Sequence, residues 1–319
     1  MGQHLLSIDD LTNDEIEKII HRAKYYEQYH PFIRPQFQNR FVANLFLEPS
    51  TRTRFSFEIA EKRLGAEVLQ FQQSVSSIIK GESLLDTLRT LESQGVEAAV
   101  IRISEEGLLR KLSEKVSLKI INAGEGRIEH PTQALLDLYT IRKYFHTVKG
   151  LRIVIIGDIS HSRVAHSNAA LLKRLGAQLI FSGPDALMDD SLEGTILPID
   201  EAIQNADVVM MLRIQFERQK MNYISSKESY RAEFGFTRER LKYLQPHAII
   251  LHPAPVNRGL EMDDEVVDHP QSKIFEQIHN GVWVRMAVIE RALEGNLRWE
   301  SLSNKEMYGI GISGFREIS

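Results

Sequence analysis

The densest group of anion-binding side chains lies between an expected strand and an expected helix, at Ser50-Thr51-Arg52-Thr53-Arg54. A helix that begins there presents free N–H groups and the positive end of its dipole, while the hydroxyls and guanidiniums add further donors. The alternative is that Ser50 only caps the helix and that the arginines lie in solvent. A cap does not require two arginines interleaved with hydroxyls. The pentapeptide therefore predicts an oxyanion-binding site.

Other polar residues follow other expected strands, where parallel sheets bind their ligands. Each is weak alone, because a histidine before proline is usually a helix cap or a surface group and an arginine after a strand is usually solvated. Their repetition at the same edge of two expected sheets favours a single interdomain cleft rich in arginine. These residues are Arg102, His130, Gln133, Arg163, Arg213, Gln215 and the segment His252-Pro253-Ala254-Pro255.

The sequence patterns typical of dinucleotide binding and of metal binding are not found. Gly157 follows an apolar run but is not followed by the further glycines of a dinucleotide-binding turn, so a nicotinamide dehydrogenase is disfavoured. The spacing of His161 and His166 predicts no metal site. We therefore expect neither a metal nor a cofactor. Ser76 and Lys80 lie in a polar stretch that by itself predicts only an exposed loop.

Alternating apolar and amphipathic segments must position these residues. Short buried-type strands followed by helical patterns indicate parallel sheets with crossover helices. Strands are expected at 41–47, 96–103, 117–123, 151–156, 178–182, 207–212 and 248–251, and helices at 12–29, 51–64, 131–145, 163–175 and 282–293. The fold class is thus α/β, with two doubly wound parallel-sheet domains joined by long helices and an active-site cleft between them.

The expected domain boundaries follow from this alternation. The first domain is expected at residues 1–145, with the C-terminal helical region 282–319 packing back on it, because an early sheet needs cover on both faces. The second domain is expected at residues 146–281.

Length and composition agree with two globular domains. The chain has 319 residues, of which 43% are hydrophobic and 26% charged, and a domain averages about 150 residues. The net charge of −4 provides no global field for nucleic acid or anionic lipid. There is no cysteine, which fits a reducing compartment, and no apolar run of membrane-spanning length. We expect a cytoplasmic protein that binds neither nucleic acid nor membrane.

Six ordered segments together resemble the aspartate carbamoyltransferases of the transcarbamoylase superfamily. The Ser-Thr-Arg-Thr-Arg motif alone indicates only the superfamily, because ornithine enzymes share it. At the position of their His-Cys-Leu-Pro segment this chain has His252-Pro253-Ala254-Pro255, which favours aspartate. The matching segments are 46–54, 80–83, 130–137, 157–164, 213–215 and 252–255.

The resemblance implies an activity and a role for each matching residue. The reaction is carbamoyl phosphate plus L-aspartate to N-carbamoyl-L-aspartate plus phosphate, an early step of pyrimidine biosynthesis. The phosphate would be bound by Ser50, Thr51, Arg52, Thr53 and Arg102. The carbonyl would be polarised by Thr53, Arg102 and His130, and the carbamoyl NH₂ oriented by Gln133, Pro253 and Ala254. Aspartate would be bound by Lys80, Arg163, Arg213 and Gln215.

The resemblance also implies an assembly. Residues matching Ser76 and Lys80 enter the site of a neighbouring subunit, so a homotrimer with shared active sites is expected. Some family members associate with regulatory chains or with dihydroorotase, and the sequence leaves both partnerships open. Two alternatives to the activity also stay open: a transcarbamoylase for another amine, such as ornithine, and a noncatalytic homologue.

Overall fold

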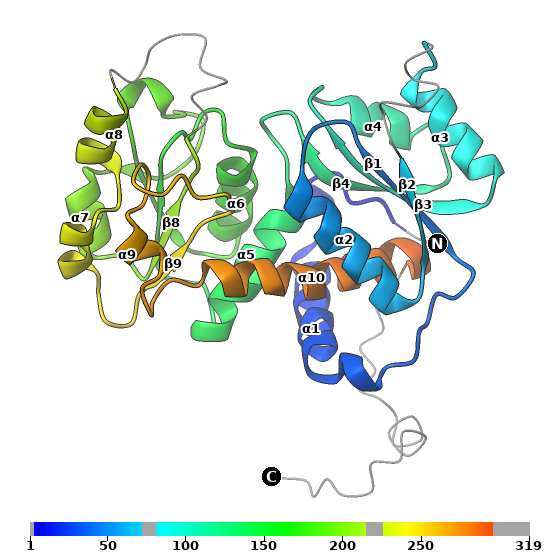
Figure 1. Ribbon diagram of the computed structural model, residues 1–319, viewed down its shortest axis with the longest axis horizontal. Helices are drawn as coiled ribbons and strands as arrows, with labels where there is room; N and C mark the ends of the chain where they lie inside the picture. Colours follow the sequence, from blue (N-terminus) through cyan, green and yellow to red (C-terminus); the bar gives the residue numbers. More distant parts are fainter. Residues whose placement is uncertain (1–2, 72–80, 215–225, 296–319) are drawn as a thin grey trace, which may run out of the picture.

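The first half of the chain forms a four-stranded parallel sheet with helices on both faces (Figure 1). The computed structural model describes residues 3–71, 81–214 and 226–295. The strand order is β2-β1-β3-β4, and neighbouring side chains of β1 point to opposite faces: Val42 joins the core under α1 and α2, and Ala43 the core under α3 and α4. The elements are α1 (Asn13–Tyr29), β1 (Phe41–Phe46), α2 (Thr51–Leu64), β2 (Glu67–Phe71), α3 (Leu84–Ser93), β3 (Val96–Ile103), α4 (Leu108–Ser113), β4 (Lys119–Glu125) and α5 (Pro131–Tyr144).

The second half repeats this plan with a five-stranded parallel sheet of order β7-β6-β5-β8-β9. Ile155 of β5 packs in the core beneath α6, and Val154 packs in the core beneath α7. The predicted fold class, with two parallel-sheet α/β domains, is confirmed. The elements are β5 (Arg152–Ile156), α6 (Arg163–Arg174), β6 (Gln178–Ser182), β7 (Thr195–Ile196), α7 (Ile199–Gln204), β8 (Val208–Met211), α8 (Lys227–Phe234), β9 (Ile249–Leu251), α9 (Asp264–Val267) and α10 (Ile274–Glu294).

Both sheets reverse their strand order near the middle. The reversal falls between β1 and β3 in the first sheet and between β5 and β8 in the second. The carboxyl ends of parallel strands at such a point form a natural crevice for ligands. Ser50 follows β1, Arg102 lies near the end of β3, and Asp158 and Arg213 follow β5 and β8.

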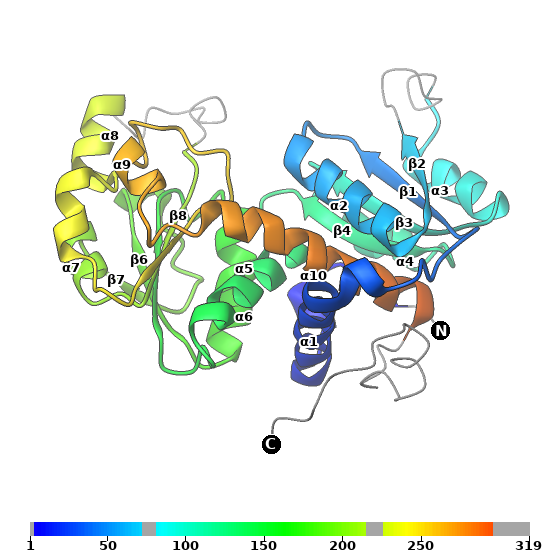
Figure 2. The same ribbon diagram turned by 60° about the horizontal axis from the view of Figure 1, so that its bottom comes forward.

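Two helices, α5 and α10, lie between the two sheets (Figure 2). The helix α10 packs against α1, α2 and α5, so the end of the described chain lies beside its beginning. One hydrophobic cluster includes Ile121 of β4, Leu135 of α5, Ile155 of β5 and Ile289 of α10. A continuous core therefore connects the two sheets.

The helix α10 begins at Ile274, before the expected start at Val282. Its first turns carry Gln277 and Asn280, and Gly281 breaks the apolar pattern that predicts a helix. A Cβ at residue 281 would lie 2.5 Å from Arg285 Nη1, so glycine makes room for a buried guanidinium. None of the helices that the structure describes is long and apolar enough to cross a membrane.

Candidate active site

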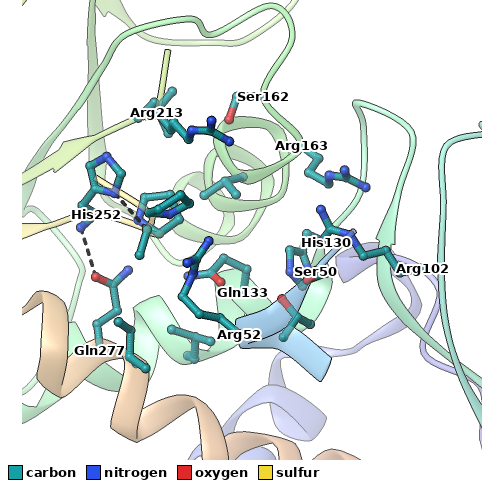
Figure 3. Close-up of a pocket in the computed structure, with 18 of the residues that line it drawn as sticks. Ser50, Arg52, Arg102, His130, Gln133, Ser162, Arg163, Arg213, His252 and Gln277 are labelled. Carbon is teal, nitrogen blue, oxygen red and sulfur yellow. Dashed lines mark hydrogen bonds between the residues drawn. The ribbon is translucent and has the colours of Figure 1, made fainter. Parts of the chain in front are cut away.

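A pocket of about 710 Å³ opens between the two sheets, at the carboxyl ends of their strands (Figure 3). Its walls come from both halves of the chain, and most of its polar atoms belong to arginine, histidine, serine and threonine side chains. Ten of the residues predicted from the sequence line it: Ser50, Arg52, Thr53, Arg102, His130, Gln133, Arg163, Arg213, Pro253 and Ala254.

The first turn of α2 forms one wall of the pocket. Ser50 is the N-cap residue, yet its side chain makes no capping hydrogen bond, contrary to the alternative in which it only caps the helix. The Arg52 side chain extends into the pocket (Figure 3). Burial and the positive charge of Arg213 lower the pKa of Arg52. An anion placed near these two guanidiniums would offset their mutual repulsion.

His130, the N-cap residue of α5, supplies a neutral imidazole to the pocket. Its side chain does not cap the helix, and its backbone N–H donates to Ser167 Oγ at 2.9 Å. Burial, together with the positive charges of Arg102, Arg285 and Arg163, holds the pKa of His130 well below its ordinary value. The imidazole is therefore uncharged at neutral pH and carries one N–H, which can donate to a carbonyl oxygen.

A partly buried carboxylate holds two pocket arginines from opposite halves of the chain. Glu48 Oε2 accepts from Arg163 Nη2 at 2.9 Å and lies 3.3 Å from Arg102 Nε. Both guanidiniums also pack on the backbone of Gly124, where a Cβ would lie 2.9 Å from Arg163 Nη1 and 3.1 Å from Arg102 Nη1. The φ of Gly124, +125°, further favours glycine. These contacts fix where the positive charges point.

The segment after β9 presents its backbone to the pocket. His252 Nδ1 accepts from the backbone N–H of Ala254 at 2.8 Å, and the backbone N–H of His252 donates to Gln277 Oε1 at 3.0 Å. These bonds hold Ala254 in the left-handed region, at φ +54°. Since Nδ1 accepts, the ring proton lies on Nε2, 3.4 Å from buried Glu261. Burial lowers the pKa of His252.

Four predicted site residues do not line the described pocket. Thr51 is exposed at the start of α2 and is not part of the pocket wall. Ser76, Lys80 and Gln215 lie outside the residues that the structure describes.

Sequence reasoning assigned no role to several residues that line the pocket or support it. Glu48 and Asp137 lie inside motifs noted in the sequence, but only their partners in space reveal their function. No sequence signal marks Gly124 or the polar face of α10, because their contacts come from segments far away along the chain. The residues of this kind are Glu48, Ser56, Gly124, Arg127, Asp137, Asp158, His161, Ser162, Gln277 and Arg285.

Comparison with known families agrees with this two-part site. Residues 3–143 match the family model described as "Aspartate/ornithine carbamoyltransferase, carbamoyl-P binding domain". Residues 149–291 match the model described as "Aspartate/ornithine carbamoyltransferase, Asp/Orn binding domain". The chain belongs to the aspartate/ornithine carbamoyltransferase family, whose members are transferases.

Individual relatives are similar over nearly the whole chain. The aspartate carbamoyltransferase catalytic subunits of Listeria monocytogenes and Enterococcus faecalis are each 48% identical, over 92% of this chain and 96% of theirs. The structure of Trypanosoma cruzi aspartate transcarbamoylase with carbamoyl phosphate and aspartate gives a TM-score of 0.83 at 31% identity, covering 92% of this chain and 97% of that one. Pyrococcus furiosus ornithine carbamoyltransferase gives 0.83 at 28% identity, covering 92% and 98%.

Proposed function

We propose that this chain transfers the carbamoyl group of carbamoyl phosphate to L-aspartate, giving N-carbamoyl-L-aspartate and phosphate, an early step of pyrimidine biosynthesis. The observation that carries the proposal is the single pocket in which guanidiniums from both sheets converge with the N-terminus of α2. Two acidic reactants repel each other in water, and convergent guanidiniums offset that repulsion.

The two halves of the chain divide the substrates between them. The first, at residues 1–145 together with the part of α10 from residue 282, binds carbamoyl phosphate, and the second, at residues 146–281, binds aspartate. The descriptions of the two family models support this order of the substrates, and the contacts of α10 with α1 and α2 support its place beside the first half. In the first half the phosphate takes donors from Ser50, Arg52, Thr53 and Arg102 in the pocket wall and from the backbone N–H of Thr51 at the start of α2. In the second half the aspartate carboxylates meet Arg163, Arg213 and Gln215, and the neighbouring subunit adds Lys80 from its first half.

The transfer proceeds by direct attack. The neutral α-amine of aspartate adds to the carbamoyl carbon, and negative charge develops on the carbonyl oxygen. The tetrahedral intermediate then expels phosphate, which carries away the proton that the amine loses. Thr53, Arg102 and His130 donate to that oxygen, and a neutral His130 does so without adding charge. Gln133 and the backbone carbonyls of Pro253 and Ala254 accept from the carbamoyl NH₂.

Aspartate is favoured over ornithine by the charge of the pocket. The fold does not separate the two activities, because the aspartate and ornithine enzymes superpose on this chain equally well, each at a TM-score of 0.83. Arg163 and Arg213 suit a second carboxylate, whereas the δ-amine of ornithine is a cation that they would repel. A noncatalytic homologue is disfavoured because the described positions of the reaction centre are occupied by suitable donors.

A trimer with shared sites is part of the proposal. Phe55 and Ile59, four residues apart on α2, are 48% and 44% exposed, and Leu69 on the edge strand β2 is 39% exposed. Phe55 and Ile59 lie one turn apart, and large apolar side chains exposed together favour burial against another chain, here a second copy. Leu69 adds an exposed apolar side chain on the edge strand, on the sheet face that carries Ala43. Ser76 and Lys80 follow this edge strand in sequence, which is where a contribution to a neighbour's site would start.

The assay that tests the activity measures phosphate release from carbamoyl phosphate with a panel of amines. L-aspartate is expected to support turnover, with N-carbamoyl-L-aspartate identified by mass spectrometry. L-ornithine serves as the control and is expected to release phosphate only at the rate of spontaneous hydrolysis. Turnover with ornithine and none with aspartate would contradict the proposal.

A further inference from the structure

A buried carboxylate behind the pocket joins three helices. Asp137 of α5 is fully buried and does not line the pocket. Its Oδ1 accepts from Gln133 Nε2 at 2.9 Å and from Gln277 Nε2 of α10 at 2.6 Å, and its Oδ2 accepts from Asn168 Nδ2 of α6 at 2.8 Å. The proposed chemistry does not use this group, yet one of its partners, Gln133, lies in the pocket wall.

An ionised carboxylate only accepts hydrogen bonds, so it dictates which end of each amide faces it. Gln133 turns its amino group toward Asp137, which leaves Oε1 as the amide atom available to a ligand. Among the residues that the structure describes, no hydrogen bond to Gln133 Oε1 is formed. Gln133 therefore offers the pocket an acceptor and not a donor.

The second amide transmits the same constraint to the loop after β9. Gln277 also turns its amino group toward Asp137, so its Oε1 accepts the backbone N–H of His252 (Figure 3). His252 in turn accepts from Ala254 N, which orients the backbone carbonyls of this loop. Both sets of acceptors proposed to contact the carbamoyl NH₂ are thus anchored on Asp137.

We propose that Asp137 is a positioning residue that makes the pocket selective for a carbamoyl group. By orienting Gln133 and Gln277, it surrounds the substituent of the carbonyl carbon with hydrogen-bond acceptors. These acceptors pair with an NH₂ group, whereas an isosteric CH₃ group would leave them without partners. A buried polar group left without a partner is costly, so the selectivity is against acetyl compounds of the same shape. The inference rests on the proposed function, because it requires that Gln133 meets the carbamoyl group.

The ionisation of Asp137 sets the conditions of a test. Burial raises its pKa to about 6, although the three amide donors and the positive charge of Arg285 oppose the rise. At pH 8 the group is therefore a carboxylate. Asp137→Leu has nearly the same shape but offers no acceptor, so that the amino groups of Gln133 and Gln277 lose the partner that orients them.

The test compares two stable ligands at pH 8 by titration calorimetry. Phosphonoacetamide and acetonylphosphonate differ only in NH₂ against CH₃ on the carbonyl carbon. The wild-type protein is expected to prefer the amide, and Asp137→Leu is expected to reduce that preference by about tenfold, the effect of losing one correctly oriented hydrogen bond. Inorganic phosphate, which does not reach Gln133 in this scheme, is expected to bind both proteins alike.

Two further variants distinguish the orientation of the amides by Asp137 from a purely structural role of this residue. Asn168→Ala removes a bond of the same kind from the other oxygen of Asp137, so it is expected to leave the ratio of the two affinities unchanged. Gln277→Leu cuts the connection to His252 and keeps Asp137, so it is expected to lower the ratio even if Asp137→Leu fails to fold.

The outcomes are distinguishable. Equal weakening of both ligands in Asp137→Leu, or a wild-type ratio in Gln277→Leu, would overturn the positioning role. A wild-type protein that releases phosphate with aspartate but binds both ligands equally would also overturn it, while the proposed function would stand. A wild-type protein with no carbamoyl transfer at all would instead remove the proposed function.

Discussion

His130 contributes hydrogen bonding and not charge to the pocket. Its imidazole is surrounded by guanidiniums, and a second positive charge there would be strongly disfavoured. A neutral donor is suited to an oxygen that becomes negative only during the reaction, because its hydrogen bond strengthens as that charge develops. In this account Arg52 and Arg102 supply the positive charge that binds the phosphate.

Replacing His130 by alanine is expected to slow the chemical step more than it weakens binding. The loss of one preorganised donor costs on the order of 10² in kcat, while the Kd of phosphonoacetamide changes little. Steady-state kinetics with calorimetry would measure both quantities. His130→Gln, which retains an N–H donor, is expected to recover part of the rate. A kcat for the alanine variant within a few fold of wild type would exclude His130 from the reaction centre.

Gly124 is expected to be essential for activity although it carries no functional group. In Gly124→Ala the methyl group would displace Arg102 and Arg163, so kcat/KM is expected to fall by at least about tenfold, as for other misplaced catalytic groups. Gly95→Ala is the matched control, because φ at Gly95 is +91° but nothing lies within 4 Å of its added Cβ. Both variants are expected to lose stability through backbone strain. Equal kinetics in the two variants would show that the arginines do not depend on Gly124.

At the scale of elements, several predicted ranges agree with the structure at both ends. The expected helix 51–64 is α2, and the expected strands 96–103 and 178–182 are β3 and β6. The helix expected at 12–29 begins at Asn13, where Thr12 and Glu15 form a capping box, because capping residues act locally. The predicted start of α10 was wrong. Its first turns are polar because they face the pocket and the buried polar network, so they lack the apolar pattern of a helix. No strand was expected at β2, whose side chains are mostly exposed at the sheet edge.

The same contrast holds for the residues of the site. Side chains that directly follow strands could be proposed from sequence, because the topology of parallel sheets places strand ends together. The residues behind them could not be proposed in this way. Asp137 and Gln277 act through contacts between helices that are distant in sequence, and such pairs leave no local pattern.

Glu61 of α2 is a buried acid that accepts a hydrogen bond from Asn44 of β1, and it makes the stability of the fold depend on pH. Burial raises the pKa of Glu61 to about 8, against the opposing hydrogen bond from Asn44. Between its ordinary value of 4.5 and about 8 the folded chain keeps a proton that the unfolded chain has lost. This group's contribution to stability therefore decreases as pH rises through that window.

Glu61→Gln is accordingly expected to lose less stability than the wild type when the pH rises from 6 to 9. The neutral amide retains an acceptor for Asn44 and has no proton to release. Melting temperatures at several pH values would measure the difference, with the exposed Glu105→Gln as a control for the loss of one carboxylate. Parallel pH profiles for wild type and Glu61→Gln would contradict the assignment.

At the scale of the whole molecule, the pocket depends on the relative placement of the two sheets. Glu48 follows a strand of the first sheet and holds Arg163 at the start of a helix of the second. This partly buried ion pair crosses between the two halves, as does the continuous core around α5 and α10. Closure of the halves on substrate is expected because their donors bind adjoining parts of one reacting pair.

Sites shared between subunits are expected to reveal themselves by complementation. Arg52→Ala and Lys80→Ala are each expected to be nearly inactive, since each removes a substrate contact. When they are mixed under conditions of subunit exchange, about one quarter of the sites in randomly assembled trimers would combine an intact Arg52 with an intact Lys80 from the neighbour. Activity near that fraction of wild type is expected. Verified exchange without recovery would place both residues in the same chain's site.

The central claim is that groups from both sheets bind two acidic reactants side by side in one pocket. A crystal structure with N-(phosphonacetyl)-L-aspartate, which joins the two reactants in one molecule, tests it most directly. The phosphonate is expected at the N-terminus of α2 beside Arg52 and Arg102, and the two carboxylates beside Arg163 and Arg213. A ligand bound through one sheet alone, or outside this pocket, would contradict the account.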